Sequence, residues 1–290
     1  MQLKSLCGNR TDRLMVTLVI VLFAVLYALV SIGNHINMRT YALDLGVYTH
    51  ALYDYAHGSS ADCGVFAWPD QNSNLLHDHF DLYLPLLSPL VYLFGSYTLL
   101  IVQIAALLFG GWGVFRLVRR WIPEGCVPLC AMVAYLGFFG VWHAVGYDYH
   151  SNVVAVNLLP WFLLLFEKRR YLWALVLMLL MCVAKESMAL WLVCVMVALM
   201  VEYRRDAASW RWLGVYGILA AVYFVVISMV VMPSMGGPSL GFWRYSHMGD
   251  SMGELALSFF TQPGEALRVF FTNFNHDPSL NGVKMEFYLC

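Results

Sequence analysis

The hydrophobic positions of this chain gather in long runs that are separated by short polar segments. Runs of about 20 residues, some shorter and one longer, cover residues 14–34, 97–118, 126–143, 153–166, 172–201 and 211–233. An apolar α-helix of about 20 residues spans the roughly 30 Å hydrocarbon core of a bilayer. The pattern predicts an all-α fold, a polytopic transmembrane helical bundle.

The run 172–201 is too long for a single crossing, because one continuous helix would extend about 45 Å. Lys185 and Glu186 interrupt this run near its middle. Charged residues at the centre of a bilayer are costly, so we expect two short helices in a hairpin that lifts both residues toward the outer surface. With this hairpin the chain has about seven membrane segments.

Residues 35–97 are predicted to form the first outer loop. Within it, residues 82–95 are apolar but short, and they contain Pro85 and Pro89. Because proline disrupts a helix interior, this helix is expected to dip into the membrane without crossing it. The predicted domains are a transmembrane helical domain, residues 1–236, and an outer segment, residues 237–290.

The distribution of charged residues predicts the orientation of the bundle. Lys and Arg gather near the N-terminus and in the loops 119–125, 167–171 and 203–210, and such residues favour the cytoplasmic side. We therefore expect a multi-pass protein of the cell membrane with a cytoplasmic N-terminus. All nine histidines then fall at or beyond the outer boundary, which suggests a polar site on that face.

Composition narrows the class of partner. The chain is 61% hydrophobic and only 12% charged, whereas about 25% of the residues in a typical soluble domain are charged. Its formal net charge is −1, so it lacks the excess of basic residues that is typical of nucleic-acid-binding proteins. We expect membrane lipid as a partner and no nucleic acid.

Candidate chemistry lies in four short segments at the predicted outer ends of the spans. The first, Tyr41–Tyr48, carries Asp44 among apolar residues, where an acid is costly unless it is paired, metal-bound or wetted. The alternative is an interfacial helix cap or a salt bridge to Arg39. The second is His77-Asp78-His79-Phe80-Asp81. It suits a metal site, and the alternative is a solvated loop.

The third segment contains Asp148 and His150 in a very short connection. A carboxylate and an imidazole suit either a divalent ion or general-base catalysis, and the alternative is a membrane anchor formed by Tyr147 and Tyr149. The fourth segment is the pair at the hairpin tip. Lys185 suits an anionic head group or a phosphate, and the alternative is an ion pair with its neighbour Glu186.

The order of these motifs along the chain resembles a known membrane-protein family. The motifs are Asp44-Leu45-Gly46-x-Tyr48 after the first span, His79-Phe80 before a Pro-Leu-rich helix, Tyr147-Asp148-Tyr149-His150 before the fourth span, and Lys185-Glu186 in the hairpin. Together they resemble the bacterial and archaeal family known as domain of unknown function 2079, over roughly residues 35–255.

That family in turn resembles the GT-C glycosyltransferases, polytopic enzymes that use polyprenyl-phosphate-linked sugar donors on the outer side of the membrane. The resemblance implies a GT-C-like N-terminal half and catalytic roles for Asp44 and Asp148. The substrate-binding residues that it implies are Tyr48, His79, His150, Lys185 and Glu186. Among them, Lys185 matches the lysine that neighbours the lipid phosphate.

The sequence departs from the GT-C pattern at the motif that could bind a metal ion. The sequence has Asp148-x-His150 where some GT-C enzymes have Asp-x-Asp. These two residues would hold a divalent cation, Mg²⁺ or Mn²⁺, if the chain uses one. Family members also continue beyond this length, and residues 285–290 begin an apolar run, so we expect a truncated chain.

The leading hypothesis is therefore a membrane glycosyltransferase that transfers a hexosyl or pentosyl group from a polyprenyl-phosphate-linked donor. The alternatives are a transporter whose outer vestibule is lined by His and Asp, and a non-catalytic membrane protein. Transporters typically contain internal repeats and polar residues at the middle of the membrane, and the sequence displays neither feature.

Overall fold

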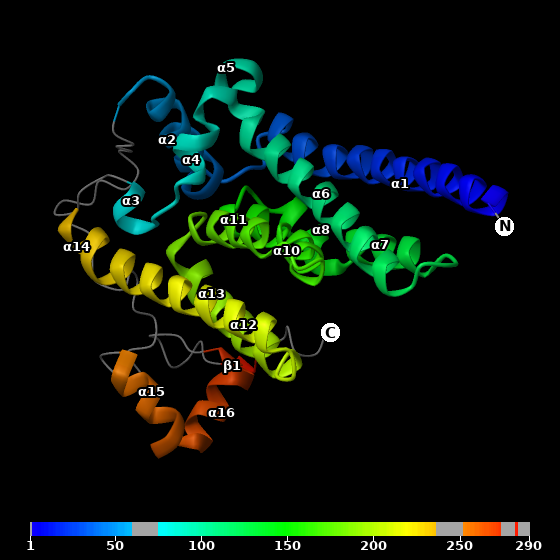
Figure 1. Ribbon diagram of the computed structural model, residues 1–290. Helices are drawn as coiled ribbons and strands as arrows, with labels where there is room; N and C mark the ends of the chain where they lie inside the picture. The colour runs from blue at the N-terminus through cyan, green and yellow to red at the C-terminus, as the bar shows by residue number, and fades with distance from the viewer. Residues whose placement is uncertain (1, 60–74, 236–251, 274–281, 284–290) are drawn as a thin grey trace. The chain divides into compact units, whose positions relative to one another are not determined.

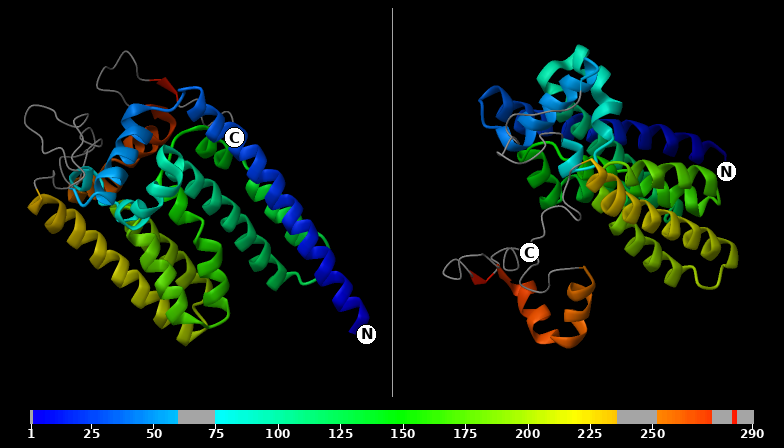
Figure 2. Two further views of the ribbon diagram at one scale, coloured as in Figure 1. Left: turned by 90° about the horizontal axis from the view of Figure 1, so that it is seen from above. Right: turned by 90° about the vertical axis from the view of Figure 1, so that its left-hand side faces the viewer.

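The computed structural model describes residues 2–59, 75–235, 252–273 and 282–283, and nearly all of them are helical (Figures 1 and 2). The chain divides into two units, residues 1–239 and 240–290. Within the described residues, β-structure is limited to β1 (Thr272–Asn273) and β2 (Gly282–Val283), which pair antiparallel. The predicted all-α helical fold is confirmed.

The first predicted span forms one long helix, α1 (Gln2–Ile36). Apolar side chains such as Leu22 and Leu29 are exposed along it, as expected for a surface that faces lipid. Its other side packs on the bundle, where the buried Tyr27 hydroxyl donates a 2.6 Å hydrogen bond to the Leu136 carbonyl. This bond satisfies a polar group that would be costly in hydrocarbon.

The predicted first outer loop begins with two helical elements, the π-helix η1 (Ala42–Gly46) and α2 (Val47–Ala56). Residues 60–74 of that loop lie outside the described part. The short helix α3 (Leu75–Asp78) follows them. A π-helix is rare and often occurs at a functional site, so the position of Asp44 inside η1 is notable.

The predicted dipping helix, 82–95, is a series of short pieces that lead into α6 (Thr98–Trp121). The pieces are α4 (Tyr83–Leu87), η3 (Ser88–Leu90), α5 (Val91–Phe94) and η4 (Gly95–Tyr97). Pro85 and Pro89 have no backbone N–H to donate to the hydrogen bonds of a continuous helix, and Gly95 adopts a positive φ of 54°. That this segment dips into the membrane without crossing it stays a prediction.

The predicted spans 126–143 and 153–166 are each divided into two helices. The elements are α7 (Val127–Leu136), α8 (Phe139–Gly146), α9 (Ser151–Val156) and α10 (Leu159–Glu167). The second division falls at Asn157, just before Pro160, and Asn157 Oδ1 accepts a 2.6 Å hydrogen bond from the Tyr135 hydroxyl. The break is therefore stabilised by a buried polar contact.

The predicted hairpin is present and turns where the charges interrupt the apolar run. Its helices are α11 (Tyr171–Cys182) and α12 (Glu186–Glu202). The last span of the first unit continues through α13 (Ala207–Val226), η5 (Ile227–Val231) and α14 (Met232–Ser234). It begins before the predicted residue 211 because Asp206 caps the amides of Ala208 and Ser209.

Ion pairs join the basic loops at one end of the first unit. Arg119 pairs with Asp12 at 2.6 Å, and Arg120 pairs with Glu167 at 3.2 Å. A third pair, at 2.8 Å, links Arg169 in the loop before α11 to Asp206 in the loop before α13. The loops that the charge pattern assigned to one side of the membrane therefore lie together. Which side that is stays a prediction.

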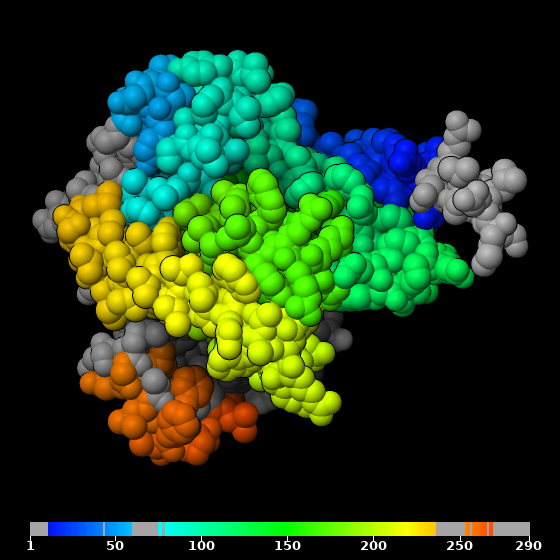
Figure 3. Space-filling model, in the orientation of Figure 1, coloured from blue at the N-terminus to red at the C-terminus, as the bar shows by residue number. Residues whose placement is uncertain are grey.

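Within the described residues, four helical stretches are long and apolar enough to cross a membrane, by length and composition. They are Thr11–Ile36, Tyr83–Trp121, Val127–Gly146 and Ala207–Ser234. In the space-filling view, the green α10 and α11 lie between the teal α6 and the yellow α13 (Figure 3). The chain is a helical membrane protein, and the count of about seven membrane segments stays a prediction.

The second unit is small in its described part. It contains α15 (Met252–Thr261) and α16 (Pro263–Phe271), which pack on each other, and the β1–β2 pair. In the β pair, Thr272 lies opposite Val283, and Asn273 lies opposite Gly282. The predicted outer location of this part of the chain stays a prediction.

Candidate functional site

Asp148 joins the segment Tyr41–Leu45 to the connection between α8 and α9. Its Oδ2 atom accepts hydrogen bonds from the Tyr41 amide at 2.7 Å and the Leu45 amide at 3.4 Å. The residue is only 2% exposed, and this burial raises the pKa of its carboxyl, as does the nearby Asp44, whereas the two amides lower it. Asp148 therefore holds the backbone of η1 in place.

Asp44 lies in η1, beside Asp148. Its Oδ2 accepts a 2.8 Å hydrogen bond from the Tyr147 hydroxyl, which raises the pKa of Tyr147 to about 12. The Tyr147 ring stacks on Tyr41 with the ring centres 5.6 Å apart, so Tyr41 and Asp44 together orient the phenol. In the described part of the chain Asp44 makes no ion pair with Arg39, and its side chain remains partly exposed.

His150 is positioned by a residue that the sequence did not single out. Gln103 of α6 accepts a 2.8 Å hydrogen bond from the His150 amide and donates to the carbonyls of Ala144 and Asp148. The His150 ring lies against Tyr147, with the ring centres 5.3 Å apart. A glutamine inside an apolar span is unusual, because polar groups there need partners. The position of Gln103 in an apolar run was therefore the feature of the sequence that could have indicated its role.

Glu186, at the hairpin tip, contacts the His79 segment rather than its neighbour. Its Oε1 lies 3.4 Å from Nδ1 of His79, and its Oε2 accepts a 3.1 Å hydrogen bond from the Phe80 amide. The alternative of an ion pair between Lys185 and Glu186 is not observed among the described residues. A backbone bond of 3.0 Å from the Leu82 amide to the carbonyl of Val183 supports the same contact.

Asp81 belongs to the second candidate segment, but the sequence did not predict that it is buried. It is 0% exposed, its Oδ1 accepts a 2.8 Å bond from the Tyr83 amide, and its Oδ2 is buried without a hydrogen-bond partner. Burial raises the pKa of Asp81 to about 6, although the Ser151 side chain, the Tyr83 amide and the nearby Lys185 each lower it in part. The alternative of a solvated loop is therefore wrong for Asp81. The side chains of His77 and Asp78 lie outside the described part.

Tyr149 packs against Tyr48 and lies near Asp81. It is fully buried, its hydroxyl has no hydrogen-bond partner, and its ring meets Tyr48 edge to face at 5.9 Å. Burial raises the pKa of Tyr149, and the nearby carboxylate of Asp81 raises it further. The alternative of Tyr149 as a surface anchor is wrong, and Tyr48, a predicted substrate-binding residue, packs in the core beside it.

The donor atoms for a metal are few. In the residues that the structure describes, no group of three or more His, Cys, Asp or Glu side chains is arranged to hold a metal ion. Asp148 and His150 supply two donors, and Mg²⁺ commonly takes its remaining ligands from water and substrate phosphates. Binding of a divalent cation by Asp148 and His150 therefore stays a prediction. Such a cation would need further ligands from substrate oxygens.

Comparison with known proteins gives one match. The sequence profile of a family described as predicted membrane protein (DUF2079) matches residues 34–279. This region contains every predicted site residue, from Asp44 to Glu186. No curated protein and no solved structure matches the chain.

Proposed function

The chain belongs to the family of predicted membrane proteins DUF2079, and from this premise we propose that it transfers a sugar from a polyprenyl-phosphate-linked donor at the outer face of the membrane. The observation that carries the proposal is the pairing of Asp44 with Tyr147 beside a second carboxylate, Asp148. A partly exposed carboxylate that is oriented by a phenol suits general-base catalysis.

In the proposed reaction, the acceptor hydroxyl attacks the anomeric carbon of the donor sugar and gives its proton to the Asp44 carboxylate. The bond between the anomeric carbon and the phosphate oxygen breaks, and its electron pair leaves with the phosphate. Asp148 acts as a positioning residue, because its carboxylate holds the Tyr41 and Leu45 amides at the two ends of the turn that carries Asp44.

Lys185 is proposed to bind the phosphate of the donor. Glu186 is engaged by His79 and the Phe80 amide, and Lys185 makes no ion pair in the part of the chain that the structure describes. An ammonium group in this position offsets the negative charge that develops on a leaving phosphate. A divalent cation, if present, would be held by Asp148 and His150 and would supply further positive charge.

A second candidate function, proton-coupled transport, is favoured by one observation. Asp81 is buried, has an unpartnered oxygen and has a pKa raised to about 6. A buried acid near a helix break is typical of groups that bind and release protons in transporters. This candidate predicts that Asp81 is essential for proton movement and that Asp44 is not.

The test is transfer of labelled sugar from a polyprenyl-phosphate donor by the purified protein in lipid nanodiscs. Asp44→Asn should lower the rate at least 100-fold, because the neutral amide cannot take the proton. Asp12→Asn is the matched control, since Asp12 pairs with Arg119 at the opposite end of the bundle. An Asp44→Asn protein that transfers sugar at the wild-type rate would remove Asp44 from the mechanism, whereas a wild-type protein that transfers no sugar would favour the transporter.

A further inference from the structure

Four basic side chains gather where α6 and α10 end, at the end of the first unit that carries the basic loops. Arg116 and Arg120 lie one turn apart on α6, and Lys168 and Arg170 follow α10. The Arg120 guanidinium joins the two segments, because it donates a 3.1 Å hydrogen bond to the Glu167 carbonyl. Loss of surrounding water lowers the pKa of Lys168, and the charges of Arg116, Arg120 and Arg170 lower it further. The four cations are therefore close enough to repel one another.

Carboxylates neutralise only a small part of this charge. Arg120 pairs with Glu167 at 3.2 Å. Arg116, Lys168 and Arg170 are exposed, and the structure shows no ion pair for any of the three in the part of the chain that it describes. Three positive charges are thus left without a carboxylate partner. Such a surface attracts anions, and Arg and Lys are the side chains that commonly bind phosphate oxygens.

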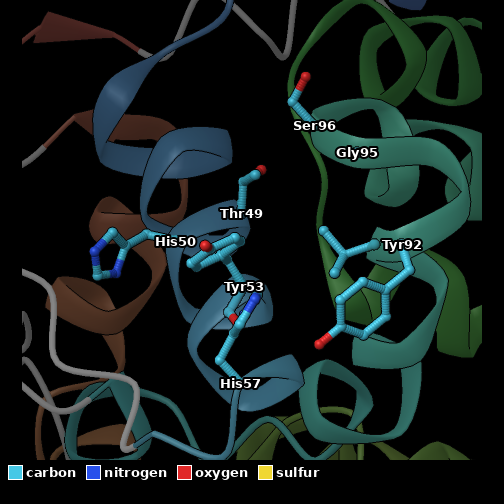
Figure 4. Close-up of a pocket in the computed structure, with 8 residues that line it drawn as sticks. Thr49, His50, Tyr53, His57, Tyr92, Gly95 and Ser96 are labelled. Carbon is cyan, nitrogen blue, oxygen red and sulfur yellow. The ribbon is translucent and has the colours of Figure 1, made fainter.

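The opposite end of α6 offers no comparable charge. A cleft lies there between α2 and the α5–η4 segment, and its lining contains no Lys or Arg (Figure 4). Its walls nearly meet, since the rings of His57 and Tyr92 lie 5.7 Å apart. The end of the unit with the basic loops is therefore the one that suits an anionic ligand.

Exposed aromatic side chains lie beside the basic cluster, closer to the middle of α6. Trp112 precedes Arg116 by one helical turn and is 37% exposed, and Phe109 is 41% exposed. The Trp161 ring of α10 stacks on Phe109 with the ring centres 4.6 Å apart and meets Trp112 edge to face at 5.0 Å. A Cβ at Gly113 would overlap the Trp161 ring, so glycine allows this contact. Tryptophan is typical of the boundary between head groups and hydrocarbon.

A largely apolar groove of about 200 Å³ begins at Phe109. Val102, Ala106 and Phe109 of α6 form one wall, and residues of α4, α9 and α11 form the others. These three residues and Arg116 lie on one stripe of α6, because they recur at intervals of three, four or seven residues. The rise from Phe109 to Arg116 is roughly 10 Å, whereas half of the hydrocarbon core of a bilayer is roughly 15 Å thick. A lipid whose charged end lies at Arg116 therefore reaches the groove.

We propose that this stripe binds an anionic phospholipid. Its phosphate lies at Arg116 and Lys168, its glycerol lies beside Trp112, and one acyl chain enters the groove at Phe109. A soluble phosphate would use the cations but neither the aromatic rings nor the groove, and a neutral lipid would leave the three charges unmatched. Basic pockets between transmembrane helices bind head groups of this class. The site shares no residue with the candidate functional site, so this binding is separate from sugar transfer.

Native mass spectrometry of the purified protein in detergent measures the binding. Phosphatidylglycerol and phosphatidylcholine with the same acyl chains are titrated separately, and inorganic pyrophosphate is the soluble competitor. The wild type should bind phosphatidylglycerol about tenfold more tightly than phosphatidylcholine, or better. Arg116→Gln and Lys168→Gln should each weaken phosphatidylglycerol binding about fivefold, the effect of one basic residue near an anionic membrane surface. Trp112→Ala should also weaken it.

Arg205→Gln is the matched control. Arg205 is an exposed cation in another basic loop, and it is not among the charges that act on Lys168. This variant should bind phosphatidylglycerol within about twofold of the wild type. An equal loss in Arg205→Gln and Arg116→Gln would indicate a general attraction to the basic loops and would overturn the defined site. Equal affinity for the two lipids, displacement by equimolar pyrophosphate, or unchanged binding by Trp112→Ala would overturn it as well.

Discussion

The hydroxyl of Tyr147 donates a hydrogen bond of 2.8 Å to Oδ2 of Asp44, and the two residues are brought together from the connection between α8 and α9 and from η1. Tyr147→Phe removes this donor and keeps the ring that stacks on Tyr41. Because a hydrogen bond to a charged group contributes about 1.5–3 kcal/mol, we expect kcat for sugar transfer to fall about tenfold or more. Initial rates over a range of donor concentrations give kcat and KM separately.

The control for this variant is Tyr97→Phe, which removes a phenolic hydroxyl from η4 without touching Asp44. It should leave kcat within about twofold of the wild-type value. A Tyr147→Phe protein with unchanged kcat would indicate that the phenol has no part in orienting Asp44.

Asp148→Ala is expected to destabilise the protein. The substitution leaves the Tyr41 and Leu45 amides without their acceptor, and each buried unsatisfied group costs about 1–3 kcal/mol. Asp148→Asn should be milder, because its amide oxygen can still accept both bonds. Thermal unfolding in detergent and the rate of proteolysis near residues 38–46 measure the difference. Equal stability of the Ala variant and the wild type would contradict this account.

Asp81 predicts a pH dependence of stability. Its pKa is raised from 3.8 to about 6 in the folded protein, so the folded state binds more protons than the unfolded state between these values. Stability contributed by this residue therefore rises as the pH falls from about 7 to 4, by about 3 kcal/mol at most.

Asp81→Asn removes that dependence. The difference in melting temperature between Asp81→Asn and the wild type should be largest near pH 7, with the variant more stable, and should shrink toward pH 4. Asp12→Asn, which replaces a partly exposed acid, should not reproduce the trend. A constant difference across this range would mean that Asp81 titrates as it does in water.

Gly110→Ala is expected to disrupt the packing of α6 against α9 and α10. A Cβ at Gly110 would overlap Oδ1 of Asn157, the atom that accepts the bond from Tyr135. Overpacking of this kind typically costs about 1–3 kcal/mol. Gly33→Ala in α1 is the matched control, since nothing lies within 4 Å of the added Cβ, and it should unfold at or slightly above the wild-type temperature because alanine favours a helix more than glycine does. Similar melting temperatures for the two variants would argue against close packing at Gly110.

Labelling of single cysteines tests the orientation. In a cysteine-free background, Trp121→Cys should react with an impermeant maleimide only after the membrane is opened, because its loop carries Arg119 and Arg120. Ser59→Cys in the first outer loop should react in intact cells. Labelling of position 121 from outside would reverse the orientation and move the candidate site to the cytoplasmic face.

The sequence alone predicted the features that depend on local composition. Helical spans follow from apolar length, and the hairpin turn at Lys185 and Glu186 follows from the cost of placing charges at the middle of a membrane. The gathering of basic residues in loops also predicted which connections share one end, and the Arg119–Asp12 and Arg120–Glu167 pairs agree with it. Each of these inferences needs only neighbouring residues and the properties of a bilayer.

Tertiary structure decided which of the polar residues meet. Glu186 bonds to His79 and Phe80, 107 and 106 residues away, and Asp148 bonds to Tyr41 across 107 residues. The burial of Asp81 likewise results from contacts with segments that are distant in the chain. The same holds for the hydrogen bonds that Gln103 makes. Hydrogen bonds act over about 3 Å, so their partners depend on how the helices pack, and no local pattern in the sequence specifies that packing.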